Sequence, residues 1–283
     1  MDALAYLNGP AADLEWRRGW THGILALAVL PFLLAGSLLL LSRIKSLWQR
    51  DESTRPVYPG QLLLLSAIAI LTHPILDTLN TYGVRWLMPF SGTWYYGDTL
   101  FIVDPWLWVT LGLGMFYSRR RDQARRPAPD NPARVAIAMV VGYVVLMAGS
   151  GAAAREIIRH DLESIFGVPV QQAMAAPMMV NPLVRRFVVE QGEEYRVGRF
   201  SWLTDPHVSP AMETFEKGTA SHPAVLAAAE TTVGRRFLSW ARFPTFTVEM
   251  LGPGQYLVHL VDLRYAERPG QEFGAASIPV TLP

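Results

Sequence analysis

The sequence contains no cysteine, which excludes disulfide bonds, thiolate metal sites and a cysteine nucleophile. The strong side-chain ligands available for a metal are therefore histidine, aspartate and glutamate. Charge is also scarce, since only 17% of the 283 residues are Asp, Glu, Lys or Arg, against about 25% in an ordinary soluble domain. The net charge is +1, so no overall basic field favours a nucleic acid as a partner.

Hydrophobic residues are abundant instead, at 51% of the sequence, and they are gathered in long runs. Four apolar segments cover residues 23–41, 61–79, 99–117 and 133–154. Each approaches the roughly 20 residues that a helix needs to cross about 30 Å of hydrocarbon. A single segment of this kind can be a buried core helix, but the number and length of the set predict a multi-pass protein of the lipid bilayer with about four spans.

The charges in the loops predict how these spans are oriented. Loops 42–60 and 118–134 are rich in arginine and lysine, whereas loop 80–97 has Arg85 as its one basic residue. Basic loops face the cytoplasm in most membrane proteins. The N-terminus, loop 80–97 and everything after the fourth span are therefore expected outside the cytoplasm.

From about Glu163 onward the sequence changes character. Residues 187–203 alternate apolar and polar side chains around a glycine-containing turn, which is typical of a hairpin. Further strands are predicted at 245–251, 255–265 and 275–282, and an amphipathic helix is predicted at 221–241. The expected fold class is a polytopic α-helical membrane domain over residues 1–162, followed by a small extracytoplasmic α+β soluble domain over residues 163–283.

Several polar side chains interrupt the apolar segments near one membrane surface. The stretch LTHPILDTLNTYG, residues 71–83, places a histidine and an aspartate in the last two turns of the second segment. In the predicted orientation, the outer ends of the first and third segments carry another histidine and two more aspartates. Imidazole and carboxylate groups from different helices that meet at one end of a bundle are what a metal site between helices requires. We predict a metal site formed by His22, His73, Asp77, Asp98 and Asp104.

Each of these residues has a simpler interpretation when it is taken alone. His73 and Asp77 lie at i and i+4 on one helix face, so they can share a hydrogen bond instead of a metal ion. Asp104 is followed by a proline and can cap a helix, Asp98 can cap the turn before it, and the histidine of the first segment can be an interfacial side chain. Their shared position favours the metal site.

Two stretches of the sequence resemble a known family. RRGWTHG at 17–23 and LTHPILDTLNTYGVRWLMPFSGTWYYGDTLFIVDPWLW at 71–108 are similar to the LexA-binding, inner-membrane-associated, metal-dependent hydrolases of bacteria. The His-x3-Asp, TYG, PFS and DxxFIxDP motifs occur in the order of that family. The resemblance implies the bacterial inner membrane as the location, a divalent metal as cofactor, and ligand positions at His22, His73, Asp77, Asp98 and Asp104.

The sequence departs from this family in two places. Many members have a histidine at the position of Arg17, which cannot be a ligand here. Members also have an additional N-terminal stretch with a Thr-His and a Pro-Asp-x-Asp, whereas this sequence begins MDALAYLNGP, as if Asp2 were the last residue of that element. The resemblance therefore implies a shortened N-terminus and the loss of part of the metal shell.

The expected activity follows from the ligand chemistry. A mixed set of histidine and carboxylate ligands suits Zn or Mn, which activates water and polarises a phosphoryl or acyl oxygen. The His-x3-Asp element is also weakly similar to the helical zinc phospholipase C and P1 nuclease group, which favours a phosphate ester, in a small molecule or a lipid, as substrate. The residues expected to be catalytic are His22, His73, Asp77 and Asp104, and those expected to bind the substrate are Arg17, Arg18 and Arg85.

Other functions remain open at this stage. The three arginines can lie among lipid headgroups instead of binding a substrate. In a non-catalytic scaffold the His and Asp side chains would hold helices together, and in a small transporter they would relay cations. A transporter predicts polar residues through the inner halves of the spans, which are almost wholly apolar in this sequence.

Overall fold

The computed structural model describes residues 18–48, 57–123, 131–205, 207–218, 220–268, 270 and 273–282. The chain divides into two compact units. One unit holds residues 1–78 and 82–96, and the other holds residues 79–81 and 97–283. The sequence predicts a boundary between a membrane domain and an outer domain at residues 162 and 163. This boundary stays a prediction, because a division into compact units does not show which residues lie in the bilayer.

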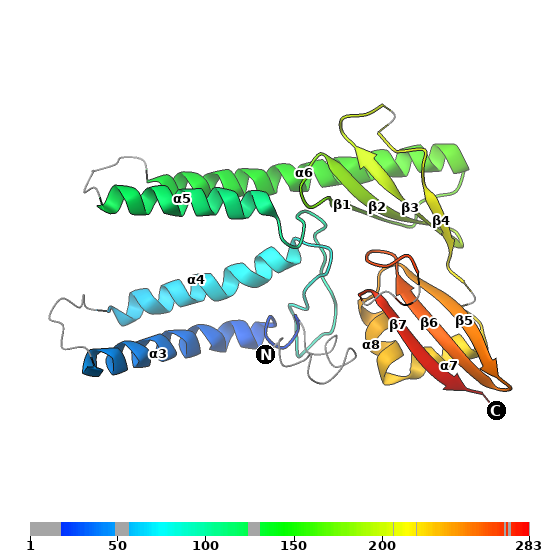
Figure 1. Ribbon diagram of the computed structural model, residues 1–283, viewed down its shortest axis with the longest axis horizontal. Coiled ribbons are helices and arrows are strands. Elements are labelled where there is room, and N and C mark those ends of the chain that lie inside the picture. The colour runs from blue at the N-terminus through cyan, green and yellow to red at the C-terminus, as the bar shows by residue number, and fades with distance from the viewer. Residues whose placement is uncertain are drawn as a thin grey trace. The chain divides into compact units, whose positions relative to one another are not determined.

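The first unit is built on two long helices, α3 at Ile24–Trp48 and α4 at Pro59–Thr78. They pack side by side as a pair (Figure 1). Large apolar side chains point away from the pair, among them Leu33, which is 58% exposed, and Leu64, which is 61% exposed. Such a surface is unfavourable in water and favourable in hydrocarbon, so these helices carry the composition of membrane spans.

The second unit begins with another helix pair, α5 at Pro105–Gln123 and α6 at Pro132–Phe166 (Figure 1). The 35 residues of α6 rise about 52 Å, well beyond the roughly 30 Å of a bilayer core. Most of its large apolar side chains up to Leu146 are exposed, whereas Ala154, Ile158 and Leu162 are fully buried against a β-sheet. The first half of α6 therefore suits lipid and the second half supports the sheet.

Three of the described helices are long and apolar enough to cross a membrane: Ile24–Ile44, Pro59–Thr78 and Pro132–Phe166. The predicted number of about four spans is not confirmed. The fourth long helix, α5, ends in the charged run Arg119 to Asp122, so its apolar part is shorter than a bilayer core. A membrane-spanning α5 stays a prediction.

A four-stranded antiparallel sheet rests on the second half of α6. Its strands are β1 at Gln172–Pro177, β2 at Val184–Gln191, β3 at Glu194–Ser201 and β4 at Glu213–Glu216, in the order β1-β2-β3-β4. The predicted hairpin is present as β2 and β3, with Gly192 in the turn at a φ of 59°, a conformation that favours glycine. Phe187 and Phe200 pack on the α6 side of the sheet.

A three-stranded antiparallel sheet follows, formed by β5 at Pro244–Gly252, β6 at Gln255–Asp262 and β7 at Ala275–Thr281. These strands agree with the sequence prediction. Two short helices, α7 at Pro223–Glu230 and α8 at Thr232–Trp240, contact the sheet, where the pattern of the sequence predicted one. The helix breaks because Thr231 is extended and its Oγ1 accepts a hydrogen bond from the Gly234 N–H, so Thr231 starts α8.

Arg185 on β2 joins the first sheet to α6. Its guanidinium is fully buried and donates hydrogen bonds to the carbonyls of Ala175 and Met147 and to Oγ of Ser150. Burial, with a smaller contribution from the charge of Arg155, lowers the pKa of Arg185 to about 10. The side chain is therefore still charged at neutral pH, and its hydrogen bonds to α6 compensate for the cost of burying it.

Replacing Arg185 by Met should destabilise the second unit by about 2–4 kcal/mol, because two buried carbonyl groups and the half-buried hydroxyl of Ser150 lose their charged donor. The midpoint of thermal unfolding of the full-length protein in detergent should fall by roughly 5–10 °C. The matched control is Arg199→Met on β3, where the side chain is exposed and the midpoint should hardly move. Equal falls for the two variants would contradict the role given to Arg185.

Candidate metal centre

The end of α4 supplies two of the candidate ligands. His73 and Asp77 are one helical turn apart, so both side chains project from the same face of α4. Just beyond, the indole of Trp86 donates a hydrogen bond to Oγ1 of Thr78. This bond ties the following loop to the last turn of α4 and holds that turn in place.

The turn before α3 supplies the third candidate ligand, His22. The turn is closed by hydrogen bonds from the N–H groups of His22 and Gly23 to the carbonyl of Gly19. It is anchored to the loop after α4 by a hydrogen bond from the Arg85 N–H to the carbonyl of Arg18. Gly19 allows the Arg85 guanidinium to lie close, because a Cβ at that position would be 2.5 Å from it and the arginine side chain would have to shift. The close approach of these two segments brings His22 to the face of α4.

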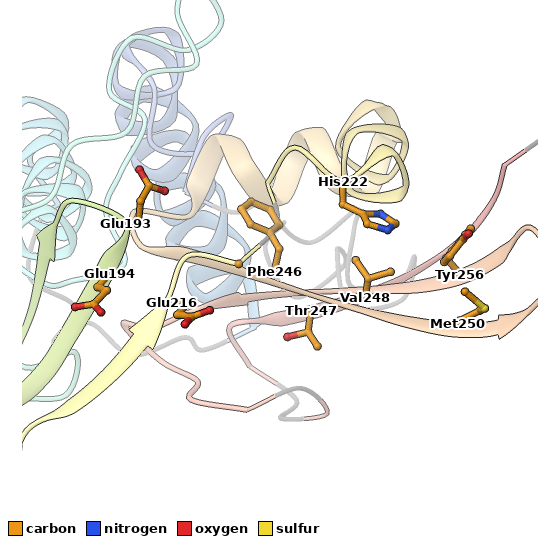
Figure 2. Close-up of a pocket in the computed structure, with 10 residues that line it drawn as sticks. Glu193, Glu194, Glu216, His222, Phe246, Thr247, Val248, Met250 and Tyr256 are labelled. Carbon is orange, nitrogen blue, oxygen red and sulfur yellow. The ribbon is translucent and has the colours of Figure 1, made fainter.

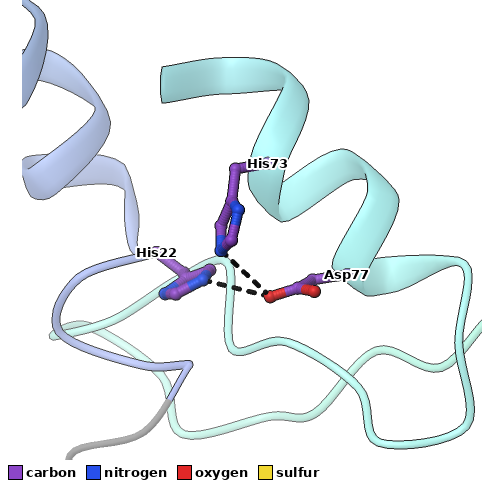
Figure 3. A group of neighbouring side chains, drawn as sticks. All are labelled: His22, His73 and Asp77. Atoms are coloured by element: carbon purple, nitrogen blue, oxygen red, sulfur yellow. Dashed lines mark ion pairs between the residues drawn. The ribbon is translucent and has the colours of Figure 1, made fainter. Parts of the chain in front are cut away.

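The three side chains converge on the carboxylate of Asp77 (Figure 3). Oδ2 of Asp77 lies 3.2 Å from Nε2 of His22 and 3.5 Å from Nε2 of His73. The imidazole rings of the two histidines are 5.1 Å apart between centroids. One potential ligand atom from each residue lies within 4.8 Å of the others, so the group has the size and the donor types of a site for one divalent ion.

Burial within this group is uneven. The side chain of His22 is 6% exposed and that of Asp77 is 17% exposed, whereas that of His73 is 68% exposed. Nε2 of His22 is shielded from solvent, and none of the described residues forms a hydrogen bond of good geometry with it. One side of the group is therefore closed by protein, and the His73 side is accessible to a small molecule.

Two neighbours act on this group. Oγ1 of Thr21 lies 2.7 Å from Nδ1 of His22; when Nδ1 carries the proton and donates it to Thr21, the lone pair of Nε2 faces Asp77. Arg18 lies on the other side, with its guanidinium 3.1 Å from Oδ1 of Asp77 and 4.6 Å from the centre of the Tyr82 ring. Asp77 thus has a cationic partner within the protein.

The other two predicted ligands belong to the second unit and have partners there. Asp98 accepts hydrogen bonds from the Arg242 guanidinium at 2.8 and 2.9 Å. Asp104 caps α5 by accepting from the N–H of Trp106 at 3.0 Å, and its second oxygen accepts from the hydroxyl of Tyr143. The structure therefore groups His22, His73 and Asp77, and the metal-binding role of Asp98 and Asp104 stays a prediction.

The arginines expected to bind substrate differ in their settings. Arg18 lies beside Asp77, as described above. Arg85 is buried, with its guanidinium 4.7 Å from the centre of the Trp94 ring. Arg17, like Asp2, lies outside the described residues.

Sequence reasoning missed three residues that contact the predicted ligands Asp98, Asp104 and His22. Arg242 is far from Asp98 in the chain, and no pattern in the sequence links them. Tyr143 lies in an apolar helix and reaches Asp104 through the packing of α6 on α5. Thr21 could have been found, because it is next to His22 in the sequence and its hydroxyl can accept a hydrogen bond from the imidazole.

Comparison with known proteins adds one match. The profile of the YdjM inner membrane protein family matches residues 1–154, which is more than half of the chain and includes both the turn before α3 and the helix α4 that carry the histidine and aspartate group. No curated protein and no solved structure matches the chain significantly. The family match agrees with the apolar helices described above and says nothing of LexA binding or of hydrolysis. The chain belongs to the YdjM inner membrane protein family.

Proposed function

We propose that this inner membrane protein is a metal-dependent hydrolase that cleaves a phosphate ester in a small molecule or a lipid. The observation that carries the proposal is the convergence of His22, His73 and Asp77, whose ligand atoms lie within 4.8 Å of one another. We further propose that this end of α4 faces the outside of the cytoplasmic membrane, as the basic loops of the sequence predict. The C-terminal sheets then lie outside as well.

The residues present fit a divalent metal. Two imidazoles and one carboxylate form a donor set that suits Zn or Mn. The buried Nε2 of His22 lacks a hydrogen bond of good geometry within the described residues, and a metal ion would give this atom a partner. A bound divalent ion would supply Lewis acidity and lower the pKa of water at the site.

The protein's own side chains have distinct tasks in this proposal. Thr21 orients the His22 imidazole through Nδ1, and Asp77 holds the negative charge between two histidines. Arg18, next to Asp77, is placed to bind a phosphate oxygen of the substrate. The exposed His73 borders the side from which the substrate enters.

A second candidate function is a membrane scaffold without catalysis. The ion pair between Arg18 and Asp77 favours it, since this contact already neutralises the carboxylate and joins the turn before α3 to α4. In the scaffold, the histidines add close polar contacts to the same carboxylate. The two functions differ in what the removal of His73 does, because that side chain is 68% exposed.

In the hydrolase, His73→Ala should remove most of the bound metal and leave the thermal unfolding midpoint nearly unchanged, since an exposed side chain contributes little to stability. The measurement is elemental analysis of the purified full-length protein, together with a thermal unfolding curve. His160→Ala is the matched control, because His160 is also an exposed histidine on a long helix, α6. The control should keep the metal content of the parent.

Two outcomes would contradict the hydrolase. The first is a parent protein without stoichiometric metal after purification in zinc- or manganese-containing buffer. The second is equal metal content in the parent and in a His73→Ala/Asp77→Ala double variant. A large loss of stability in His73→Ala without any loss of metal would support the scaffold.

Replacing Arg18 by Gln tests the proposed phosphate contact. With bis(p-nitrophenyl) phosphate as the probe, the KM should rise about tenfold or more, because a charge-assisted hydrogen bond to the substrate is lost. The metal content should not fall, since Asp77 loses a competing cation. Arg159→Gln, at an exposed arginine of α6, is the control. An unchanged KM in Arg18→Gln, in a preparation with full metal content, would show that Arg18 does not bind the phosphate.

A further inference from the structure

A cavity of about 640 Å³ lies beside strand β5, and all the residues that line it belong to the second unit (Figure 2). Its floor is made by side chains of β5 and β6, and its rim carries three glutamates. None of these residues has a place in the proposed hydrolysis, so the cavity is a separate feature of the protein.

The cavity follows an open edge of the second sheet. The strand order β5-β6-β7 leaves one side of β5 without a neighbouring strand of that sheet. The N–H of Phe246 points to this side, where it donates a hydrogen bond to the carbonyl of Lys217. Backbone groups of a strand alternate in direction with a period of two residues. The N–H and C=O groups of Val248 and Met250 therefore point to the same open side.

A glycine allows the chain to pass close to the start of the open edge of β5, at Phe246. Gly218 follows Lys217 at a φ of 81°, and a Cβ at this position would collide with the carbonyl oxygen of Phe246. The chain passes close over β5 at that point, after the single bond between Lys217 and Phe246. Beyond it the edge of β5 is available from Val248 until the irregularity between Met250 and Gly252.

The side chains around this edge combine apolar and acidic groups. Phe246, Val248 and Met250 form an apolar strip with Tyr256 opposite (Figure 2), and Met250 is 68% exposed. Of the rim glutamates, Glu194 pairs with Arg196.

Glu193 and Glu216 are both exposed and pair with no cation within the described part of the chain. His222 also borders the cavity, but its Nδ1 accepts the N–H of Ala224 as the cap of α7. The unpaired charge at the rim is therefore negative.

We propose that the edge of β5 binds an extended segment of a partner protein that carries lysine or arginine side chains. The segment would add a strand beside Val248 and Met250, with backbone hydrogen bonds as the common contact. Its apolar side chains would cover the strip of Phe246, Val248 and Met250, and its basic side chains would reach Glu193 and Glu216.

The charges also decide against a second copy of this chain as the occupant. Strand β5 of a second copy carries no lysine or arginine, so a symmetric pair formed through β5 would offer Glu193 and Glu216 no cation from that strand. A basic partner strand pairs with these carboxylates and satisfies the open backbone groups. Sheet edges of this kind are templates for pairing with another chain.

The test uses the full-length protein in detergent and a short fluorescent peptide that alternates lysine and valine, with anisotropy as the readout. A peptide that alternates glutamate and valine should bind at least about tenfold more weakly, because it faces the same carboxylates. A lysine and valine peptide with N-methylated backbone groups on one side should lose binding by a similar factor, since it cannot pair with the edge. This last comparison leaves the protein unchanged.

Variants of the protein examine the two contacts separately. Val248→Pro removes the outward N–H without affecting the bonds of β5 to β6 and should weaken binding about tenfold, whereas Val248→Thr keeps the N–H and should not. Glu193→Gln with Glu216→Gln should weaken binding about fivefold, as expected for two exposed ion pairs. The matched control is Glu213→Gln, which lies on β4 with Glu216 but outside the cavity.

Three results would overturn the proposal. One is equal binding of the lysine and glutamate peptides, which would remove the role of the acidic rim. Another is unchanged binding of the N-methylated peptide, which would remove the strand pairing. The third is a concentration-dependent dimer that Val248→Pro abolishes while no peptide binds, which would assign the edge to a second copy. None of these readouts depends on metal content or hydrolysis.

Discussion

Helix α6 serves two environments at once, and the arrangement of the second unit depends on it. Its first half presents apolar side chains such as Leu146 outward, and its second half buries Ala154, Ile158 and Leu162 under the first sheet. The change occurs around Ser150, where Arg185 of β2 donates hydrogen bonds to the helix. A charged side chain is fully buried there because carbonyl groups of α6 and β1 accept its hydrogen bonds.

The end of α4 also holds a charged side chain that needs polar partners. Asp77 lies at the end of an apolar helix, where an unpaired carboxylate would be costly. The structure surrounds it with His22, His73 and Arg18, and the guanidinium of Arg18 supplies a positive charge beside it. The same constraint explains the second unit, where Asp98 pairs with Arg242 and Asp104 both caps α5 and accepts from Tyr143. Asp77, Asp98 and Asp104 therefore each have partners, but of different kinds.

Sequence patterns predicted part of this fold well. Long apolar runs and the alternation of residues 187–203 are local signals, and they led correctly to the helices α3, α4 and α6 and to the hairpin of β2 and β3. The break at Thr231 depends on one side chain that caps a helix within an otherwise helical pattern. For the site, the spacing of His73 and Asp77 was informative, whereas the pairing of Asp98 with Arg242 arises from tertiary packing over a long stretch of chain, which no local pattern contains.

The contact between Arg18 and Asp77 is compatible with both a metal centre and a structural joint, and its geometry shows why. Arg18 approaches Oδ1 of the carboxylate, whereas the two histidines approach Oδ2. The two oxygens therefore serve different neighbours. An arginine on one oxygen can keep the turn before α3 attached to α4 while the other oxygen faces the imidazoles. Because the guanidinium keeps its charge at any physiological pH, this attachment does not depend on the protonation of either histidine. The structural joint and the proposed metal centre would therefore share one carboxylate.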